Sequence, residues 1–215
     1  MTNNDIKTFY EQRGIKRVCH FTSLTNLAGI FQDQFIYSTD ELESRNYSFV
    51  KNDLKRRDNN IAGISCSITV PNKRLLWRWM KESEDDWVVL AIAPTILRRY
   101  CTFFPSNASK DNGAHGMEGI SGLQKMFFTS GRHHGLDDSR PTDIQAEVMV
   151  KDRIPLRLIN GIFVENESVK HTVNYLCKEL LPESSELRKL EKILVNDRMF
   201  RECDDDLNYW GTWNG

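Results

Sequence analysis

The sequence predicts an α+β fold, with antiparallel or mixed strands packed against helices. Strand-like and helix-like segments mix along the chain, but they lack the regular βαβ rhythm of a doubly wound sheet. The chain also lacks a GxxxxGK[ST] phosphate loop and a GxGxxG turn between a strand and a helix. These absences weaken an assignment to the nucleoside triphosphatases or to the Rossmann domains.

Length and composition fit a folded protein with its own hydrophobic core. The chain has 215 residues, of which 40% are hydrophobic and 27% charged, and its net charge is −1. Its longest apolar stretch, Trp87–Ile92, is far shorter than the roughly 20 residues that a membrane-spanning helix needs. The N-terminal segment has no apolar signal core, so we expect a cytoplasmic protein without a membrane partner.

The cysteines are odd in number, scattered, and form no CxxC pair. We therefore expect a reducing compartment, no disulfide framework and no metal site. Cys66 is more readily interpreted as a small buried residue than as a nucleophile.

The first expected elements are a strand and a helix. Residues 17–21 have the pattern of a short strand. Ser23 can cap a following helix, whose apolar positions Leu24, Leu27 and Phe31 have helical spacing.

Two further strands are expected at residues 63–70 and 87–93, separated by a basic, aromatic helix at 73–81. The continuous apolar run in the second of these strands is typical of a buried central strand. Pro94 can start a helical turn that ends near Arg99.

Residues 101–140 read as a long region of loops punctuated by glycines, with one helix at 120–128. Apolar and polar residues then alternate from Gln145 to Val150, which predicts a strand, and Leu158–Val164 is a second strand. Two helices are expected at the end of the chain, over Ser168–Leu180 and Ser184–Asp197.

Glu147 is the first candidate for a chemical role, because it lies within a strand between the apolar residues Ala146 and Val148. Such a carboxylate faces solvent, meets a partner, or belongs to a site. In a site it would orient a sugar hydroxyl or stabilise a cationic transition state.

His20 and Arg56 are the other candidates. His20 lies at the end of a strand, directly before a helix N-terminus that favours anions, and its alternative is a structural histidine. Arg56 lies in a polar helical turn at 52–58, where it either binds phosphate or belongs to a solvated face.

Charge is unevenly distributed along the chain. Residues 51–78 hold seven basic and two acidic side chains, a difference of +5. Trp77 and Trp79 lie in the same stretch, and helical spacing places one of them in the core. Basic residues interleaved with aromatic ones suit single-stranded nucleic acid, whose phosphates meet the cations and whose bases stack on the rings.

Taken together, several segments resemble the DarT family of nucleic-acid ADP-ribosyltransferases. They occur in the family's order. The matching segments are His20–Leu27, Asn52–Asp58, Ile64–Ile68 with Pro71-Asn72, Trp87–Leu90, Phe104–Ala108, and Thr142–Val150 with Ile154-Pro155. The Pro71-Asn72 and Asn107-Ala108 segments look more similar to the branch that modifies guanosine than to the thymidine branch.

The resemblance implies an ADP-ribosyltransferase-like split mixed β-sheet core with flanking helices over residues 1–165. Residues 166–215 would be a C-terminal helical extension of the same domain. It also implies an enzyme that cleaves NAD and transfers ADP-ribose to a base, by the branch resemblance guanine, of single-stranded DNA. Such an enzyme would be the toxin of a toxin–antitoxin system, paired with a macrodomain-type antitoxin that removes the modification.

The resemblance assigns roles to individual residues. Glu147 and Arg56 would be the catalytic residues. Glu147 would hold a ribose hydroxyl and stabilise the oxocarbenium-like state. Arg56 would contact the pyrophosphate, or help to deprotonate or position the target base. The residues implied in NAD binding are His20, Phe21, Thr22, Asn26 and Arg56. The residues implied in substrate binding are Asn72, Asn107 and Trp77.

The sequence departs from the family pattern at two positions, so the resemblance does not decide which target the binding surface takes. Ser106 stands where the family usually has arginine, and Lys73 stands where an aromatic residue is expected. Two alternatives therefore remain, which are the same chemistry on RNA and a non-catalytic module that binds nucleotides or nucleic acid.

Overall fold

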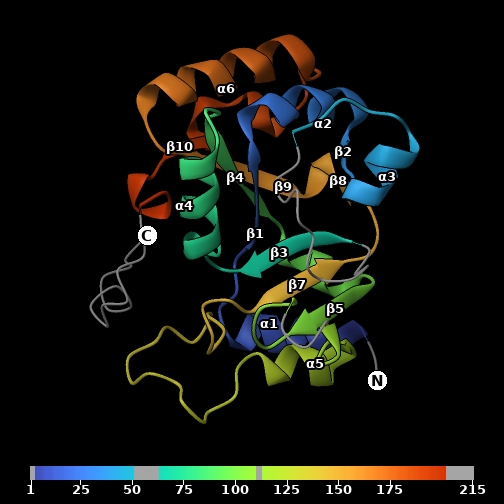
Figure 1. Ribbon diagram of the computed structural model, residues 1–215, viewed down its shortest axis with the longest axis vertical. Helices are drawn as coiled ribbons and strands as arrows, with labels where there is room; N and C mark the ends of the chain where they lie inside the picture. The colour runs from blue at the N-terminus through green and yellow to red at the C-terminus, as the bar shows by residue number, and fades with distance from the viewer. Residues whose placement is uncertain (1–2, 51–62, 110–112, 202–215) are drawn as a thin grey trace.

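The computed structural model describes residues 3–50, 63–109 and 113–201, which form a sheet flanked by helices (Figure 1). The helices are α1 (Asn3–Gln12), α2 (Leu27–Asp33), α3 (Thr39–Ser44), α4 (Lys73–Glu82), α5 (Gly119–Lys125) and α6 (Glu167–Leu180). The strands are β1 (Val18–Ser23), β2 (Phe35–Ile36), β3 (Ile64–Ile68), β4 (Trp87–Ile92), β5 (Cys101–Phe104), β6 (Met117–Glu118), β7 (Glu147–Val150), β8 (Ile154–Pro155), β9 (Ile159–Val164) and β10 (Ile193–Val195).

Eight of these strands form one mixed sheet in the order β10-β9-β4-β1-β3-β7-β5-β6. Strand β1 pairs with β4 along all six of its residues, but with β3 only at Val18–Ile68 and Cys19–Ser67. The sheet therefore parts into two halves after Cys19, one ending at β1 and the other at β3. The expected α+β class with a split mixed sheet and flanking helices is confirmed.

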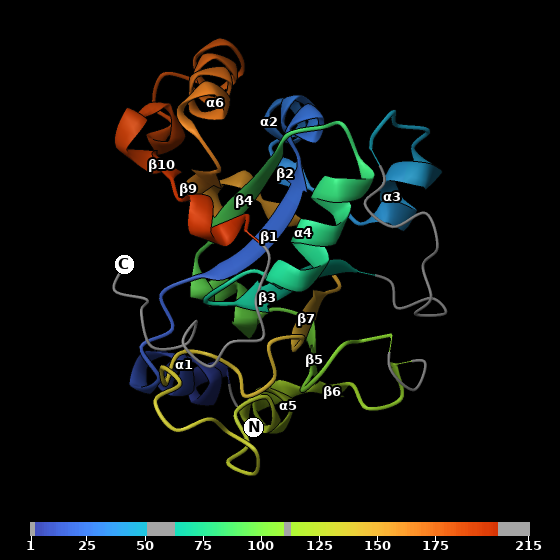
Figure 2. The same cartoon turned by 60° about the vertical axis from the view of Figure 1, so that its left-hand side comes forward.

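Helices cover the half-sheet of β1, β4 and β9 on both faces. Figure 2 shows α4 beside β1, with α2 and α6 toward the top of the view. On one face Val88 and Leu90 pack in the main core with α2 and α6. On the other face Cys19 and Val89 pack against Leu76 of α4. Strand β4 is buried along its whole length, as its continuous apolar sequence predicts.

The helix expected after residue 23 is present, but it begins with a 3₁₀ turn over Leu24–Asn26 before α2. The hydroxyl of Ser23 accepts a hydrogen bond from the amide of Thr25 at 3.1 Å, which starts this turn. The carboxylate of Asp85 in turn accepts from the Ser23 hydroxyl at 3.0 Å. Ser23 therefore fixes the point at which β1 ends.

The helix predicted over Ser184–Asp197 is wrong. The chain there forms short 3₁₀ turns and strand β10, which pairs in parallel with β9 through Ile193 and Ile162. Of the leucines that suggested a helix, Leu187 is buried, but Leu190 and Leu194 are exposed. An open sheet edge at β9 thus overrides the helical spacing.

The described cysteines are buried free thiols, as the interpretation of Cys66 anticipates. Burial raises the pKa of the Cys19, Cys101 and Cys177 thiols to about 12. Because the thiolate is the reactive form, these groups serve packing. Within the described residues, no helix is both long and apolar enough to cross a membrane.

We expect Phe31→Ala to lower the free energy of unfolding by about 3–5 kcal/mol, because it leaves a cavity under α2. Phe31 is fully buried in the main core. Leu190→Ala is the control, since Leu190 is 52% exposed and should change stability by less than about 0.5 kcal/mol. Urea denaturation measures both variants, and equal effects would contradict the burial of Phe31.

Candidate active site

Glu147 lies at the start of β7, in the half-sheet that begins at β3. Cross-strand pairs fix its side of the sheet, since Cys19 pairs with Ser67 and Ser65 pairs with Met149. Because alternate residues of a strand point to the same face, Glu147 projects from the same face as Ser65 and Cys19. This is the face that α4 covers over β1 and β4.

The Glu147 side chain is buried, with 7% of its surface exposed, so the solvent-facing alternative is wrong. Its Oε2 accepts a hydrogen bond of 2.7 Å from the backbone amide of Ala108. Its Oε1 accepts one of 3.3 Å from the hydroxyl of Ser65. These two donors come from the loop after β5 and from β3, and they fix the orientation of the carboxylate.

His20 lies on β1, just past the point where β1 and β3 part. Its Nδ1 is 2.9 Å from the carbonyl oxygen of Ser65. Because a carbonyl oxygen only accepts, Nδ1 carries the proton, and Nε2 of the neutral ring is an acceptor. Desolvation lowers the pKa of His20, and the hydrogen bond to Ser65 opposes this shift.

Ser65 therefore joins the two predicted residues, through its carbonyl to His20 and through its hydroxyl to Glu147. Sequence reasoning assigned no role to Ser65 or to the amide of Ala108. The small polar residues that alternate in Ile64–Ile68 were the available signal for Ser65. A backbone donor such as the Ala108 amide leaves no such signal.

Asn26 anchors a neighbouring segment. Its side-chain oxygen accepts from the amide of Val50 at 2.9 Å, and its side-chain nitrogen donates to the Val50 carbonyl and to the Thr22 hydroxyl, each at 3.0 Å. Thr22 is itself buried. The two residues thus hold Val50, while their contact with NAD stays a prediction. Arg56 lies outside the described residues.

Three other predicted residues have structural contacts. Phe21 packs against Trp79 with ring centroids 5.2 Å apart. Asn72 is buried, and its Oδ1 caps α4 by accepting from the amide of Leu75 at 3.2 Å. Asn107 closes its own turn by accepting from the amide of Ser109 at 2.8 Å. Their roles toward NAD or a base stay predictions.

Trp77 and Trp79 differ as the helical spacing predicts. Trp79 packs on the apolar cluster of β1 and β4, whereas Trp77 is half-buried, with the ammonium of Lys81 5.7 Å from its ring centroid. Lys73, where the family pattern expects an aromatic residue, is buried in the first turn of α4.

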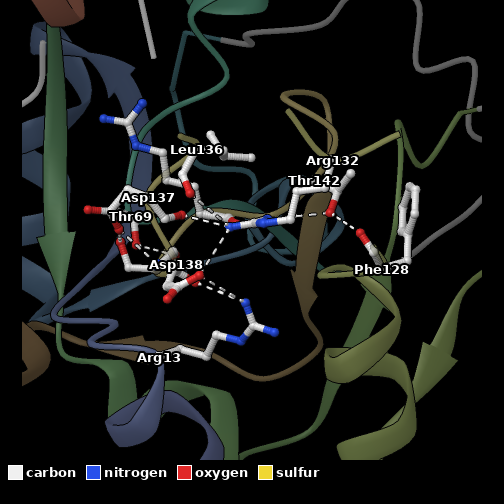
Figure 3. A network of polar contacts seen from close by, with 10 residues as sticks. Arg13, Thr69, Phe128, Arg132, Leu136, Asp137, Asp138 and Thr142 are labelled. Atoms are coloured by element: carbon white, nitrogen blue, oxygen red, sulfur yellow. Dashed lines mark hydrogen bonds and ion pairs between the residues drawn. The ribbon is translucent and has the colours of Figure 1, made fainter. Parts of the chain in front are cut away.

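A network of polar contacts shapes the loop between α5 and Glu147 (Figure 3). The guanidinium of Arg132 donates to the carbonyls of Arg140 at 2.9 Å and Asp137 at 2.8 Å. The hydroxyl of Thr142 donates to the Phe128 carbonyl at 2.6 Å. The Arg132 side chain thus supplies hydrogen bonds to two backbone carbonyls of the loop. Backbone carbonyls outside helices and strands need such partners, because they have no backbone amide to pair with.

The same loop is tied to β3 and α1. The hydroxyl of Thr69, directly after β3, donates to the Ser139 carbonyl at 2.7 Å. Thr69 has φ of 67°, which is strained for a β-branched residue. Arg13, directly after α1, forms an ion pair of 3.8 Å with Asp138. The Ser139 hydroxyl lowers the pKa of Asp137, while burial opposes the shift.

Neither of two further cavities is lined by Glu147 or His20. A cavity of about 10 Å³ lies beside Ser67 and Arg140. Another, of about 400 Å³, lies beside Phe9 and Gln124, which belong to α1 and α5.

The site residues themselves offer a fixed carboxylate and a neutral imidazole acceptor, which suit sugar hydroxyls and a developing positive charge.

Comparison with known proteins agrees with the sequence resemblance. A family model described as "ssDNA thymidine ADP-ribosyltransferase, DarT" matches residues 19–200. No curated protein matches the chain.

Solved structures of similar fold include complexes of bacterial DarT proteins. Thermus sp. 2.9 DarT in complex with ADP-ribosylated ssDNA is 15% identical, with a TM-score of 0.62 over 87% of this chain and 97% of that one. The same protein in complex with NAD⁺ gives 15% identity and a TM-score of 0.59, over 86% of this chain and 98% of that one.

Thermosipho africanus DarTG in complex with ADP-ribose is 16% identical, with a TM-score of 0.57 over 86% of this chain. The present chain spans about half of that protein, 51% of its length. At these identities the likeness concerns the fold.

We expect the His20 imidazole to titrate below about 6.5, the usual value for histidine, because desolvation favours its neutral form. Between the folded and unfolded pKa values the unfolded chain binds the proton more readily, so the free energy of unfolding falls as the pH drops through this range. NMR titration of the His20 ring measures the midpoint, with the urea-unfolded protein as reference. A midpoint equal to or above that reference would contradict the desolvation of the ring.

Proposed function

Because the chain belongs to the DarT family of single-stranded-DNA ADP-ribosyltransferases, we propose that it transfers ADP-ribose from NAD to a base of single-stranded DNA. The observation that best supports the proposal is the fixed Glu147 carboxylate, joined to His20 through Ser65. Relatives of the same fold hold NAD⁺ and ADP-ribosylated ssDNA in their solved structures.

In the proposed reaction the bond between nicotinamide and C1 of its ribose breaks, and nicotinamide leaves with the bonding electrons. A nitrogen of the base forms the new bond to C1 and loses its proton. Glu147 accepts a hydrogen bond from a ribose hydroxyl and stabilises the positive charge that develops on the sugar. Nε2 of His20 accepts a hydrogen bond from a hydroxyl of NAD, since it is the unprotonated nitrogen of the ring.

The remaining roles extend this scheme. Thr22 and Asn26 shape the NAD site by holding Val50, and Phe21 lines it. Arg56 contacts the pyrophosphate or positions the target base. Asn72, Asn107 and Trp77 belong to the side that receives DNA. A single strand presents its bases already unpaired, so the enzyme has no duplex to open.

Guanine is the proposed target base, on the resemblance of Pro71-Asn72 and Asn107-Ala108 to the guanosine-modifying branch. The description of the matching family names thymidine, so thymine is the competing outcome. We further propose that the protein is a cytoplasmic toxin whose cognate antitoxin is a macrodomain-type hydrolase. The relative named DarTG supports such a pairing.

One experiment tests substrate, base and reaction together. Purified protein is incubated with labelled NAD and with DNA oligonucleotides that each contain a single guanine or a single thymine in an otherwise uniform strand, and with their RNA counterparts. Mass spectrometry identifies the product. Transfer to guanine in DNA alone supports the proposal in full, and transfer to thymine or to RNA corrects its base or its nucleic acid. Saturable binding of NAD and DNA with no release of nicotinamide would indicate a non-catalytic module.

We expect Glu147→Gln to lower the transfer rate by about 10²–10³-fold, because the charge that faces the developing cation is lost while the side-chain shape is kept. Glu118→Gln is the matched control, since Glu118 is an exposed carboxylate of β6 paired with Lys151. Single-turnover kinetics measure both variants. Full transfer by Glu147→Gln would remove Glu147 from the mechanism.

We expect Ser65→Ala to lower kcat by about tenfold with little change in unfolding temperature. The change removes the hydroxyl donor to Glu147 but keeps the backbone carbonyl that binds His20. Ser67→Ala, two residues along the same face of β3, is the control and should stay within about twofold of the wild type. If the two variants behave alike, the Ser65 hydroxyl does not orient the carboxylate.

A further inference from the structure

Helix α4 has two distinct faces. Successive residues turn by about 100°, so Leu76 and Met80 share one side, and both belong to the apolar cluster on β1 and β4. The opposite side carries four residues at positions i, i+3, i+4 and i+7, which we term the α4 stripe: Arg74, Trp77, Arg78 and Lys81. The stripe therefore consists of three cations and one aromatic ring.

The stripe lies on the same side of the sheet as the Glu147 carboxylate. Cross-strand pairing places Cys19 and Glu147 on one face, and Cys19 packs in the same cluster as Leu76. Within the sheet, β1, which lies beneath α4, is two strands, or about 10 Å, from β7. The stripe itself lies above the sheet, on the side of α4 that faces away from β1 and β4. Figure 2 shows α4 beside β1, with its lower end next to β3, the strand that carries Ser65.

The packing of α4 on the sheet does not explain why the stripe consists of cations and an aromatic ring, because these side chains lie outside the apolar cluster beneath the helix. Arg78 is 65% exposed and its Nε is paired with Glu82 at 2.9 Å, an exposed pair of the kind that contributes little to stability. Such a cation can exchange its carboxylate partner for a phosphate. The Trp77 ring is half-buried and keeps an accessible surface beside Lys81.

We propose that the α4 stripe binds the DNA next to the target nucleotide, with Arg78 and Lys81 on phosphates and a flanking base stacked on Trp77. Cations that track the backbone and a ring that stacks a base are the two features of single-strand binding. From Arg74 to Lys81 the stripe is about 10 Å long, which matches about three nucleotides of a stacked strand. This inference rests on the proposed function, because it assigns part of the same substrate.

The test compares Trp77→Ala, Trp77→Phe and the double variant Arg78→Gln/Lys81→Gln with the wild type. Fluorescence anisotropy of a labelled 12-residue single strand measures Kd at several salt concentrations in the absence of NAD. We expect Trp77→Ala to raise Kd by about tenfold, and Trp77→Phe to restore most of the affinity, because stacking needs only a ring. The double variant should reduce the slope of log Kd against log salt by about 1.4, or about 0.7 for each phosphate that a cation no longer neutralises.

Helix α6, on the opposite face of the sheet, and the 3₁₀ turn that follows it provide matched controls. Tyr175→Ala removes a helical aromatic residue that is 62% exposed. Lys178→Gln/Lys189→Gln removes two exposed cations, of which Lys189 is paired with Glu186 much as Arg78 is paired with Glu82. Both controls should bind DNA like the wild type, and thermal denaturation verifies that all variants are folded.

Transfer assays separate the two proposals. The stripe variants should raise KM for DNA and leave kcat at saturating DNA within about twofold of the wild type. If the wild type transfers ADP-ribose to DNA and the stripe variants match it in Kd and salt slope, the α4 stripe does not bind DNA, and the proposed function is unaffected. If the wild type binds the strand through the stripe but transfers nothing, the proposed function is wrong, and the DNA-binding role of the stripe is supported. A preference of the stripe for RNA over DNA would overturn the assignment to DNA.

Discussion

The site depends on the separation of β1 from β3 after a single continuous pairing of two residues. Beyond Cys19 the backbones of β1 and β3 no longer pair with each other. The His20 ring donates the hydrogen bond to the Ser65 carbonyl in place of a backbone amide. The same serine then turns its hydroxyl to Glu147. A split that would otherwise expose backbone groups is thereby used to bring an imidazole and a carboxylate from separate half-sheets to one residue.

A second layer of contacts holds the segments around this point. Asn26 satisfies both backbone groups of Val50, and Arg132 satisfies carbonyls on either side of the loop that leads to Glu147. Thr69 has a strained backbone conformation, and its hydroxyl donates a hydrogen bond to the same loop. Groups that must stay in place during a reaction are commonly supported by such fixed partners.

The sequence predicted correctly those elements whose apolar and capping residues match their place in the packed structure. The uniform apolar run of β4 and the capped turn after Ser23 both form where they were expected. The helix predicted around Leu190 failed because β10 completes an edge of the sheet, which is a tertiary effect. Glu147 and His20 were chosen as candidates from their positions in strands. Ser65 was not, because its contacts with both residues arise only when β1, β3 and β7 lie side by side. The amide of Ala108 could not be identified, because every residue other than proline carries such a donor.

The order of strands in the sheet has a consequence for biosynthesis. The sheet neighbours of β1 are β3 and β4, and β3 is completed only by β7, whose first residue is Glu147. A ribosome-bound chain that ends before β7 has no Glu147, and its half-sheet of β1 and β4 has no β9 to cover its edge. Pairing between strands so distant in sequence also makes folding slow. Synthesis itself therefore delays assembly of the candidate site, since a chain that ends before β7 cannot bring Glu147, Ser65 and His20 together from local segments.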